Sequence, residues 1–293
     1  SRPVQATLPS RYEAPTEVGD AVALLSKEDG ARVLAGGTDL MVQMRLGATR
    51  PPVFVDIKRI PRLRRLEVNG AELIAGAAVP AAEIFENEEI RQCWPGLAEA
   101  TDLIGSTQIQ GRATWSGNLC NASPAADSIP ALIACGATAT IAGTGGERKV
   151  PVEGFITAPG QTILERGELV VEFNVPRPPP RSSDAYLRLI PRSEMDIAVV
   201  GAAVSVSVED DGRVSAARVV LGAVAPTAIR VHGAEQALIG SQLEDVALAA
   251  AAEASSDAAN PIADKRGTIE YRKTVAGVLT KRAARIAYDR ARA

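Results

Sequence analysis

The 293-residue chain is poor in the side chains that most often carry catalysis or bind metals. It has one histidine, His232, so a histidine-based metal site and a serine-type catalytic triad both lack parts. Its three cysteines, Cys93, Cys120 and Cys135, are too few and too widely spaced for a zinc site or a disulfide framework. We therefore expect a cytoplasmic protein without metal ligands or catalytic side chains of its own, which needs a borrowed cofactor for demanding chemistry.

The chain also lacks a dominant sign of charge and long apolar runs. Its 32 basic and 35 acidic residues leave a formal net charge of −3 without a sustained block of either sign, which argues against nucleic acid or anionic lipid as a partner. No apolar run approaches the ~20 residues that a membrane span requires, and no signal-peptide pattern is present. Hydrophobic residues make up 46% and aromatic residues 3%, so we expect two or three domains with aliphatic cores.

Hydrophobic periodicity in the first 176 residues predicts short, mixed elements. Helices over 18–25 and 40–46 and strands over 31–35 and 53–57 predict a small β-α-β-like unit. Further along we expect a helix from Ala82, a helix that runs into a loop over 97–109, and strands over 137–141 and 168–175.

A proline-rich cluster over 176–183 is the clearest linker, because consecutive prolines sustain neither a helix nor a central strand. We place the main domain boundary there, between domains at 1–176 and 184–293. Beyond it, strands are expected over 198–208 and 213–221 with a hairpin turn between them. From Ala234 the pattern predicts mainly helices, including 243–255 and 268–291.

Two adjacent glycines, Gly36 and Gly37, interrupt an apolar run and are followed by Thr38 and Asp39. Because glycine has no Cβ, phosphate oxygens can approach successive backbone N–H groups at such a site. The alternative is a tight turn between a strand and a helix, which is the better interpretation of this motif alone.

A second stretch, residues 108–130, is dense in small and short polar side chains. Thr114, Asn118, Asn121, Ser123 and Asp127 offer hydroxyl, amide and carboxylate groups on what we expect to be a glycine-interrupted loop, suited to a large ligand with many hydroxyls. The alternative is an irregular loop stabilised by its own turns. Two such loops in one domain, neither with a catalytic base beside it, favour a dinucleotide cofactor.

On these motifs the chain resembles the FAD-binding medium subunit of the molybdenum hydroxylases, the group of xanthine dehydrogenase, carbon monoxide dehydrogenase and aldehyde oxidoreductase. Residues 35–39, Ala-Gly-Gly-Thr-Asp, match the first flavin motif of this family. Residues 114–118, Thr-Trp-Ser-Gly-Asn, match the second, which is usually Thr-Ile-Gly-Gly-Asn. Supporting matches follow at 122–127, 186–192, 196–200 and 270–272, so the resemblance spans the chain.

The resemblance implies an α+β fold. A two-part FAD-binding domain of the PCMH type, like that of vanillyl-alcohol oxidase, would occupy 1–176 with subdomains at about 1–57 and 58–176. A C-terminal domain of antiparallel sheet and helices would follow.

The same resemblance implies an oxidoreductase subunit that carries FAD and transfers electrons. It would accept them from the [2Fe-2S] clusters of a small partner subunit and pass them to NAD, a quinone or oxygen. A large subunit would hold the molybdenum cofactor and oxidise the substrate, and the complex would be a dimer of heterotrimers. Substrate oxidation by this chain alone is not expected.

The resemblance also implies the cofactor contacts. The first stretch would wrap the FAD pyrophosphate with backbone amides, the second motif would contact the pyrophosphate and nearby sugar groups, and Asp127 would accept hydrogen bonds from flavin or ribose hydroxyls. Arg188, at a position often held by lysine, would stabilise the anionic reduced flavin. The residues implied in FAD binding are Val33, Leu34, Ala35, Gly36, Gly37, Thr38, Asp39, Leu40, Ile104, Thr114, Ser116, Gly117, Asn118, Ser123, Asp127, Val170 and Arg188.

Four residues depart from the family pattern. Gly111 and Ala113 stand where the family often has asparagine and glycine, and the other two lie within the second motif. Ser116 replaces a glycine, so either this position needs no positive φ or close approach, or the loop is altered. Trp115 replaces the usual isoleucine; we favour hydrophobic filling beneath the loop over stacking on the flavin. These changes leave open a flavin-free scaffold subunit as the alternative function. A self-contained FAD oxidase is disfavoured, because no histidine or cysteine is placed for covalent flavin attachment.

Other candidate residues have simpler interpretations. Arg192 and Asp196 are expected to form a structural ion pair, His232 to lie at the surface, and Cys120 to be a small packed residue without redox function. The basic run along 272–292 is typical of a solvated helix face, or alternatively of a surface that docks an acidic partner.

Overall fold

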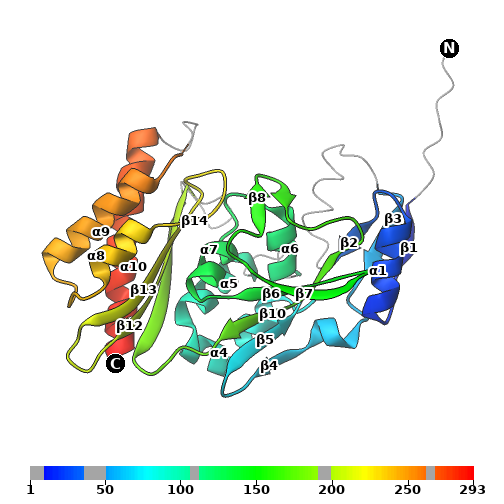
Figure 1. Ribbon diagram of the computed structural model, residues 1–293, viewed down its shortest axis with the longest axis horizontal. Helices are drawn as coiled ribbons and strands as arrows, with labels where there is room; N and C mark the ends of the chain where they lie inside the picture. Colours follow the sequence, from blue (N-terminus) through cyan, green and yellow to red (C-terminus); the bar gives the residue numbers. More distant parts are fainter. Residues whose placement is uncertain (1–9, 36–50, 106–111, 191–198, 262–267) are drawn as a thin grey trace, which may run out of the picture.

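A computed structural model describes residues 10–35, 51–105, 112–190, 199–261 and 268–293. Figure 1 shows three parts in a row: a small unit with β1 to β3, a middle sheet covered by helices, and a C-terminal sheet with its own helices. The antiparallel sheets and accompanying helices confirm the α+β expectation.

The first part is a parallel sheet of order β1-β3-β2, with helix α1 packed near it. Its elements are β1 (Arg11–Glu13), α1 (Val18–Lys27), β2 (Arg32–Leu34) and β3 (Val53–Asp56). Helix α1 buries one apolar stripe, Ala21, Val22 and Leu25, as the periodicity predicted. The helix expected over 40–46 lies outside the described residues.

The middle part is a five-stranded antiparallel sheet of order β4-β5-β10-β6-β7. Its strands are β4 (Leu66–Val68), β5 (Glu72–Gly76), β6 (Thr138–Gly143), β7 (Gly146–Pro151) and β10 (Leu169–Pro176), beside a small pair, β8 (Ile156–Ala158) and β9 (Gln161–Thr162). A 3-10 helix η1 (Pro61–Arg64) precedes β4, and five α-helices follow: α3 (Ala81–Glu86), α4 (Glu88–Cys93), α5 (Pro95–Gly105), α6 (Trp115–Asn121) and α7 (Ser128–Ala134). Val171, Phe173 and Val175 of β10 are buried in one hydrophobic cluster with Leu119 of α6.

The prediction of a loop over 108–130 was wrong for much of that stretch, because α6 and α7 occupy it. Thr114 caps the start of α6 with its side chain, and Ala122 ends it in the left-handed conformation at φ 53°. The apolar residues of the two helices are buried. Tertiary packing thus overrides the low helix propensity of the Trp, Ser, Gly and Asn residues of α6.

The C-terminal part is an antiparallel sheet of order β11-β12-β13-β14 with three helices. Its elements are β11 (Ser182–Leu189), β12 (Val200–Val208), β13 (Val214–Gly222), β14 (Ile229–Arg230), α8 (His232–Leu238), α9 (Asp245–Ala258) and α10 (Ile269–Arg292). The hairpin β12–β13 and the two long helices confirm the prediction. Strand β11, which begins inside the proline-rich cluster, was not predicted.

The C-terminal sheet contributes to two cores. Tyr186, Ala203 and Val220 belong to the hydrophobic cluster of the first and middle parts. Their neighbours Ala185 and Ala202 belong instead to a second cluster with α8, α9 and α10. Side chains alternate across a strand, so neighbouring residues of the C-terminal sheet point into different cores. This sheet is therefore buried on both faces.

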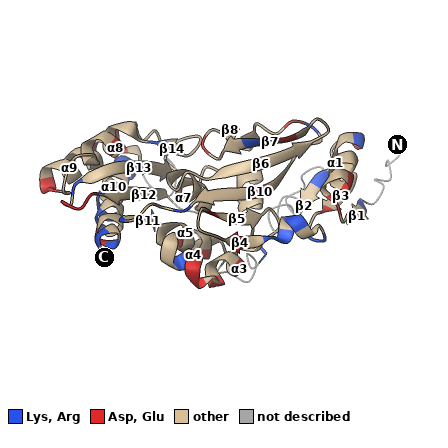
Figure 2. Cartoon of the chain, turned by 60° about the horizontal axis from the view of Figure 1, so that its bottom comes forward, with Lys and Arg blue, Asp and Glu red and all other residues tan. Residues whose placement is uncertain are grey.

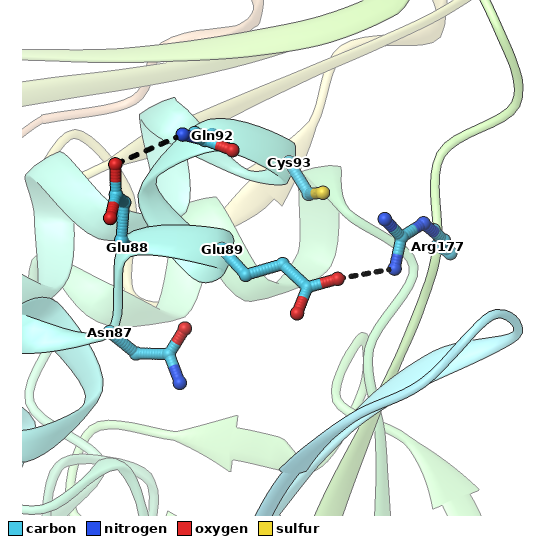
Figure 3. A pocket seen from close by; sticks show the side chains of 6 residues that line it. All are labelled: Asn87, Glu88, Glu89, Gln92, Cys93 and Arg177. Carbon is cyan, nitrogen blue, oxygen red and sulfur yellow. Dashed lines mark hydrogen bonds and ion pairs between the residues drawn. The ribbon is translucent and has the colours of Figure 1, made fainter.

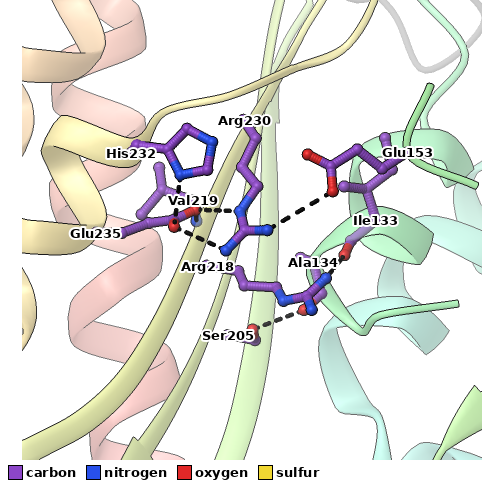
Figure 4. A network of polar contacts seen from close by, with 9 residues as sticks. All are labelled: Ile133, Ala134, Glu153, Ser205, Arg218, Val219, Arg230, His232 and Glu235. Carbon is purple, nitrogen blue, oxygen red and sulfur yellow. Dashed lines mark hydrogen bonds and ion pairs between the residues drawn. The ribbon is translucent and has the colours of Figure 1, made fainter. Parts of the chain in front are cut away.

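Polar contacts also join this sheet to the middle helices (Figure 4). Arg218 Nη1 donates to the carbonyl of Ile133 at 3.1 Å, and Ser205 Oγ donates to that of Ala134 at 2.7 Å, so both satisfy carbonyls at the end of α7. Arg230 lies 3.6 Å from Glu153 across the same boundary.

A carboxylate of the sheet caps a second helix. Asp184 accepts hydrogen bonds from the backbone N–H groups of Gly96 at 2.9 Å and Leu97 at 2.8 Å, in the first turn of α5. Arg290 of α10 adds a contact with Glu99 of α5 at 2.7 Å. The C-terminal sheet therefore completes helix ends that belong to another part of the chain.

Charged side chains are unevenly placed on the surface (Figure 2). Basic residues gather along α10, and acidic residues gather on α3 and α4, whose first turns carry Glu83, Glu88 and Glu89. Among the described residues, no helix is long and apolar enough to cross a membrane, and no group of three or more His, Cys, Asp or Glu side chains is placed to hold a metal.

Candidate functional site

The first predicted motif begins at the carboxyl ends of two parallel strands. Val33 and Leu34 close β2, half-buried, and Ala35 follows with 9% of its surface exposed. Leu34 pairs with Asp56 of β3, and its carbonyl accepts from the N–H of Ile57 at 3.2 Å. The remaining residues of this motif, Gly36, Gly37, Thr38, Asp39 and Leu40, lie outside the described residues. The described part of the motif thus ends at the carboxyl edge of a parallel sheet, a place where ligands commonly bind.

Asp56 stands at the end of β3, opposite Leu34 of the first motif in the strand register, and is 3% exposed. Burial alone would raise the pKa of its carboxyl, but hydrogen bonds from the Tyr12 hydroxyl and the Lys58 N–H, together with the Lys58 ammonium 3.2 Å away, hold that pKa below its usual range. The side chain is fixed as a carboxylate beside the first motif.

The second motif forms the first turn of α6. Thr114 is the N-cap, and its Oγ1 accepts from the N–H of Gly117 at 2.9 Å. The motif is anchored to the start of α3 by a bridge between Thr114 and Pro80 and by a 2.8 Å bond from the N–H of Ala81 to the carbonyl of Ala113. The backbone at the start of the motif is therefore tied to the segment that begins α3.

Ser116 lies in a regular helical turn without a positive φ. It lies in α6, and its hydroxyl points into the protein, where it donates to the carbonyl of Ala77 at 2.6 Å and lies 3.2 Å from Thr114 Oγ1. The side chain is 6% exposed. Of the two explanations for the lost glycine, the structure supports the first, that this position needs no positive φ.

Trp115 fills the core beneath the motif. Its side chain is 2% exposed, its Nε1 donates to Thr101 Oγ1 at 3.1 Å, and its ring meets Phe173 edge to face with 5.7 Å between centroids. Hydrophobic filling, which we favoured over stacking on a ligand, is confirmed.

Asp127 and Arg188 form a buried ion pair between α7 and β11. Arg188 Nη1 lies 2.9 Å from Asp127 Oδ2, and both side chains are 9% exposed. The other carboxylate oxygen accepts from the Tyr186 hydroxyl at 2.5 Å. Burial raises the pKa of Asp127, whereas Tyr186 and Arg188 act in the opposite direction. Burial and the facing carboxylate raise the pKa of the Tyr186 hydroxyl well above its ordinary value, so it stays a donor.

The other predicted contact residues divide into core and polar positions. Ile104 and Val170 are buried in the same cluster as Ala35 and Trp115, so the structure brings parts of both motifs onto one core. Asn118 accepts from the Ser128 hydroxyl at 3.0 Å, and the Ser123 hydroxyl accepts from the N–H of Ala125 at 3.3 Å.

Several weaker expectations are also resolved. His232 is a surface residue, with 71% of its side chain exposed. Cys120 is exposed rather than packed, because Trp115, Ser116 and Leu119 form the buried face of α6 and position 120 lies beside it. Arg192 and Asp196 lie outside the described residues.

A cavity of about 600 Å³ lies elsewhere, between α4 and the strand end of β10 (Figure 3). It is lined by Asn87, Glu88, Glu89, Gln92, Cys93 and Arg177, and Arg177 is paired with Glu89 at 3.0 Å. None of the residues predicted to bind FAD lines it. This cavity is therefore not the candidate site.

Sequence reasoning assigned no role to Tyr186, which the structure places in the site. The spacing of Tyr186 and Arg188 puts both side chains on one face of a strand. That signal would have paired them, had β11 been predicted.

The comparisons with known proteins agree with this arrangement. The family described as "FAD binding domain in molybdopterin dehydrogenase" matches residues 7–178, and "CO dehydrogenase flavoprotein C-terminal domain" matches 185–287. The carbon monoxide dehydrogenase medium chain of Hydrogenophaga pseudoflava is 36% identical over 97% of this chain and 99% of that protein. The xanthine dehydrogenase FAD-binding subunit of Escherichia coli is 32% identical over 92% of this chain and 93% of that protein. A solved structure of carbon monoxide dehydrogenase from Hydrogenophaga pseudoflava superposes with a TM-score of 0.91, covering 98% of this chain and 99% of that chain.

Proposed function

Because the chain belongs to the FAD-binding medium subunits of the molybdenum hydroxylases, we propose that it transfers electrons from a partner subunit's [2Fe-2S] clusters to NAD, a quinone or oxygen. It is an oxidoreductase subunit whose cofactor is FAD, and the molybdenum and iron-sulfur groups belong to partner subunits. Bound FAD supplies the electron-transfer chemistry, while the protein binds and orients it.

One observation supports flavin binding over a flavin-free scaffold: the second motif forms a regular helical turn that Thr114 caps. The scaffold alternative depends on the two departures, Trp115 and Ser116. Both side chains are buried and hydrogen-bonded inside the protein, to Thr101 and to the carbonyl of Ala77. Neither substitution therefore disturbs the turn that Thr114 caps.

Each group of predicted site residues would contact a different part of FAD. The backbone of 33–40 and of the second motif would hold the pyrophosphate. Asp127 has accepted one hydrogen bond on each oxygen and keeps lone pairs for flavin or ribose hydroxyls. Arg188 would place its positive charge near the isoalloxazine, where it favours the anionic reduced form. Ser123, Ile104 and Val170 would contribute smaller contacts at the edge of the cofactor.

The domain assignment remains part of this proposal. We place a FAD-binding domain at 1–176, where β10 ends, and a C-terminal domain at 184–293, whose first residue lies two residues inside β11. The partners would be a large molybdenum subunit and a small [2Fe-2S] subunit in a dimer of heterotrimers. The relatives' names "medium chain" and "FAD-binding subunit" support a multi-subunit assembly. Three free thiols support a cytoplasmic location.

Purified protein tests flavin binding directly. We expect absorption near ~450 nm and release of FAD on denaturation. Asp127→Asn should lower FAD occupancy, whereas Asp210→Asn, at a fully exposed turn, should leave it unchanged. Protein purified without any flavin would support the scaffold function and contradict ours.

Co-purification tests the partners. Expressed together with its large and small partner subunits, the chain should elute with them in one complex. Substrate should reduce the FAD only when both partners are present. Turnover of a substrate by the isolated chain with a dye acceptor would contradict the electron-transfer role. Assays of the complex with aldehydes, purines, N-heterocycles and carbon monoxide would identify the substrate.

A further inference from the structure

Asp127 occupies a helix N-cap position but does not cap the helix. It precedes α7, and its side chain accepts no hydrogen bond from the first turn of that helix. Aspartate is among the preferred N-cap residues, because its carboxylate can accept a hydrogen bond from an N–H group in the first turn of the helix. Here the carboxylate is directed toward β11 instead, so the local stabilisation is given up for a contact between two parts of the chain.

The backbone of Asp127 is already helical, at φ −62° and ψ −35°, rather than extended like that of a capping residue, and its carboxylate is engaged by the Tyr186 hydroxyl. This hydroxyl donates to Asp127 Oδ1 at 2.5 Å from a ring that is 4% exposed. Arg188, two residues along β11, takes the other oxygen at 2.9 Å. Two donors on one strand face therefore fix both carboxylate oxygens.

Gly201 provides the space for this hydroxyl. It stands in β12, opposite Arg188 in the strand register. A Cβ added at Gly201 would lie 2.6 Å from the Tyr186 hydroxyl oxygen and 3.3 Å from ring atom Cζ. The hydroxyl thus occupies the volume that any larger residue at this position would need.

We propose that Tyr186 is a positioning residue for the cofactor site: its hydroxyl holds the Asp127 carboxylate against Arg188, and Gly201 keeps the place for that hydroxyl. The inference rests on the proposed binding of FAD by Asp127 and Arg188. In this proposal, side chains of the C-terminal sheet orient the Asp127 carboxylate, which belongs to the FAD-binding part of the chain.

The first test compares two buried tyrosines. Tyr186→Phe should raise the dissociation constant for FAD about tenfold, measured by fluorescence titration of the full chain freed of flavin. Tyr288→Phe is the matched control, because the Tyr288 hydroxyl is also buried and donates to the carbonyl of Gly212 at 2.7 Å, in the C-terminal part. Both variants should lose similar thermal stability, but Tyr288→Phe should change FAD affinity less than about twofold. Equal FAD affinity in the two variants would overturn the proposal while leaving the proposed function intact.

The second test uses the space at Gly201. Gly201→Ala should displace the Tyr186 hydroxyl and weaken FAD binding as much as Tyr186→Phe does. Combined with Tyr186→Phe, it should add little, since the new methyl group occupies the volume that the hydroxyl has left. Additive losses of FAD affinity in the double variant would overturn the proposal.

The third test is the pH profile of FAD binding. Among the described residues, the titratable and charged groups that face Asp127 are Tyr186 and Arg188, both on β11, while β12 presents Gly201 and Ala203. The hydrogen bond from Tyr186 favours the carboxylate, so Tyr186→Phe should move the acid loss of FAD affinity to higher pH. An unmoved acid limb would overturn the proposal, and wild-type protein that binds no FAD at any pH would overturn both it and the proposed function.

Discussion

Replacing Asp184 should destabilise a part of the chain to which it does not belong. Its carboxylate, 5% exposed, accepts from the N–H groups of Gly96 and Leu97 and from Cys135 Sγ at 3.2 Å. Asp184→Ala leaves two buried N–H groups of α5 without acceptors, at ~1–3 kcal/mol each. Burial raises the pKa of Asp184 despite these bonds, which shows that burying the ionised carboxylate is unfavourable. Removing the carboxylate also removes this unfavourable contribution, which offsets part of the loss in stability. We expect a net loss of ~3 kcal/mol in the free energy of unfolding.

Tryptophan fluorescence can test this prediction, because it reports unfolding of the middle part of the chain. Both tryptophans, Trp94 and Trp115, are buried in the middle part, whereas Asp184 lies in the C-terminal sheet. With a urea m-value of ~3 kcal/mol/M, the fluorescence midpoint of Asp184→Ala should fall by about 1 M. Asp184→Asn, which keeps one acceptor, should lose about half as much, and the exposed Asp210→Ala should change the midpoint little. An unchanged tryptophan transition in Asp184→Ala would show that the two parts unfold independently and would refute the reasoning.

Three further predictions concern the core, the second motif and the response to pH. Gly76→Ala should abolish folding or cost more than ~3 kcal/mol, because the added Cβ would lie 2.3 Å from the backbone oxygen of Leu63, whereas Gly70→Ala, with no atom within 4 Å, should be nearly neutral in urea unfolding. Trp115→Phe should lose ~1–2 kcal/mol with the indole hydrogen bond but keep the flavin absorption spectrum; an altered spectrum would contradict its burial in the core. The folded-state pKa of Asp56 is lowered, so its stabilisation is present above the unfolded pKa of ~3.9 and is lost as pH falls through the folded value. Wild-type protein should therefore unfold at higher urea than Asp56→Asn at pH ~6 but not at pH ~2, and an equal difference at both pH values would contradict this assignment.

Periodicity predicted the elements that are buried on one regular stripe or alternate along a strand. The buried stripe of α1 and the alternation over the last five residues of β12 were visible in the sequence, because each follows a regular local period. Helix α6 was missed because its Trp, Ser, Gly and Asn residues have low helix propensity, and the Thr114 cap and the tertiary core stabilise it. Only the end of α7 near Leu132 was recognised, because Pro130 interrupts the helical pattern before it.

The candidate site was predicted in outline from its glycine motifs, but not its supporting contacts. Ser116 reaches Ala77, 39 residues earlier, and Tyr186 reaches Asp127, 59 residues earlier. Neither pairing leaves a local pattern, because each depends on how β11 and the turn before α3 pack against the middle helices. The same limitation explains why the departures at Trp115 and Ser116 looked more disruptive in the sequence than they are in the structure.

The two-sided burial of the C-terminal sheet restricts how this subunit can be recombined with its relatives. A hybrid that joins residues 1–178 of one relative to the later residues of another would cut through the contacts of Asp127, Asp184 and Arg218 at once. Each of these residues serves a group on the other side of the junction. Donor and acceptor must therefore be transplanted as matched sets, and a junction placed within β12, after Gly201, would preserve more of them than one placed in the proline-rich linker.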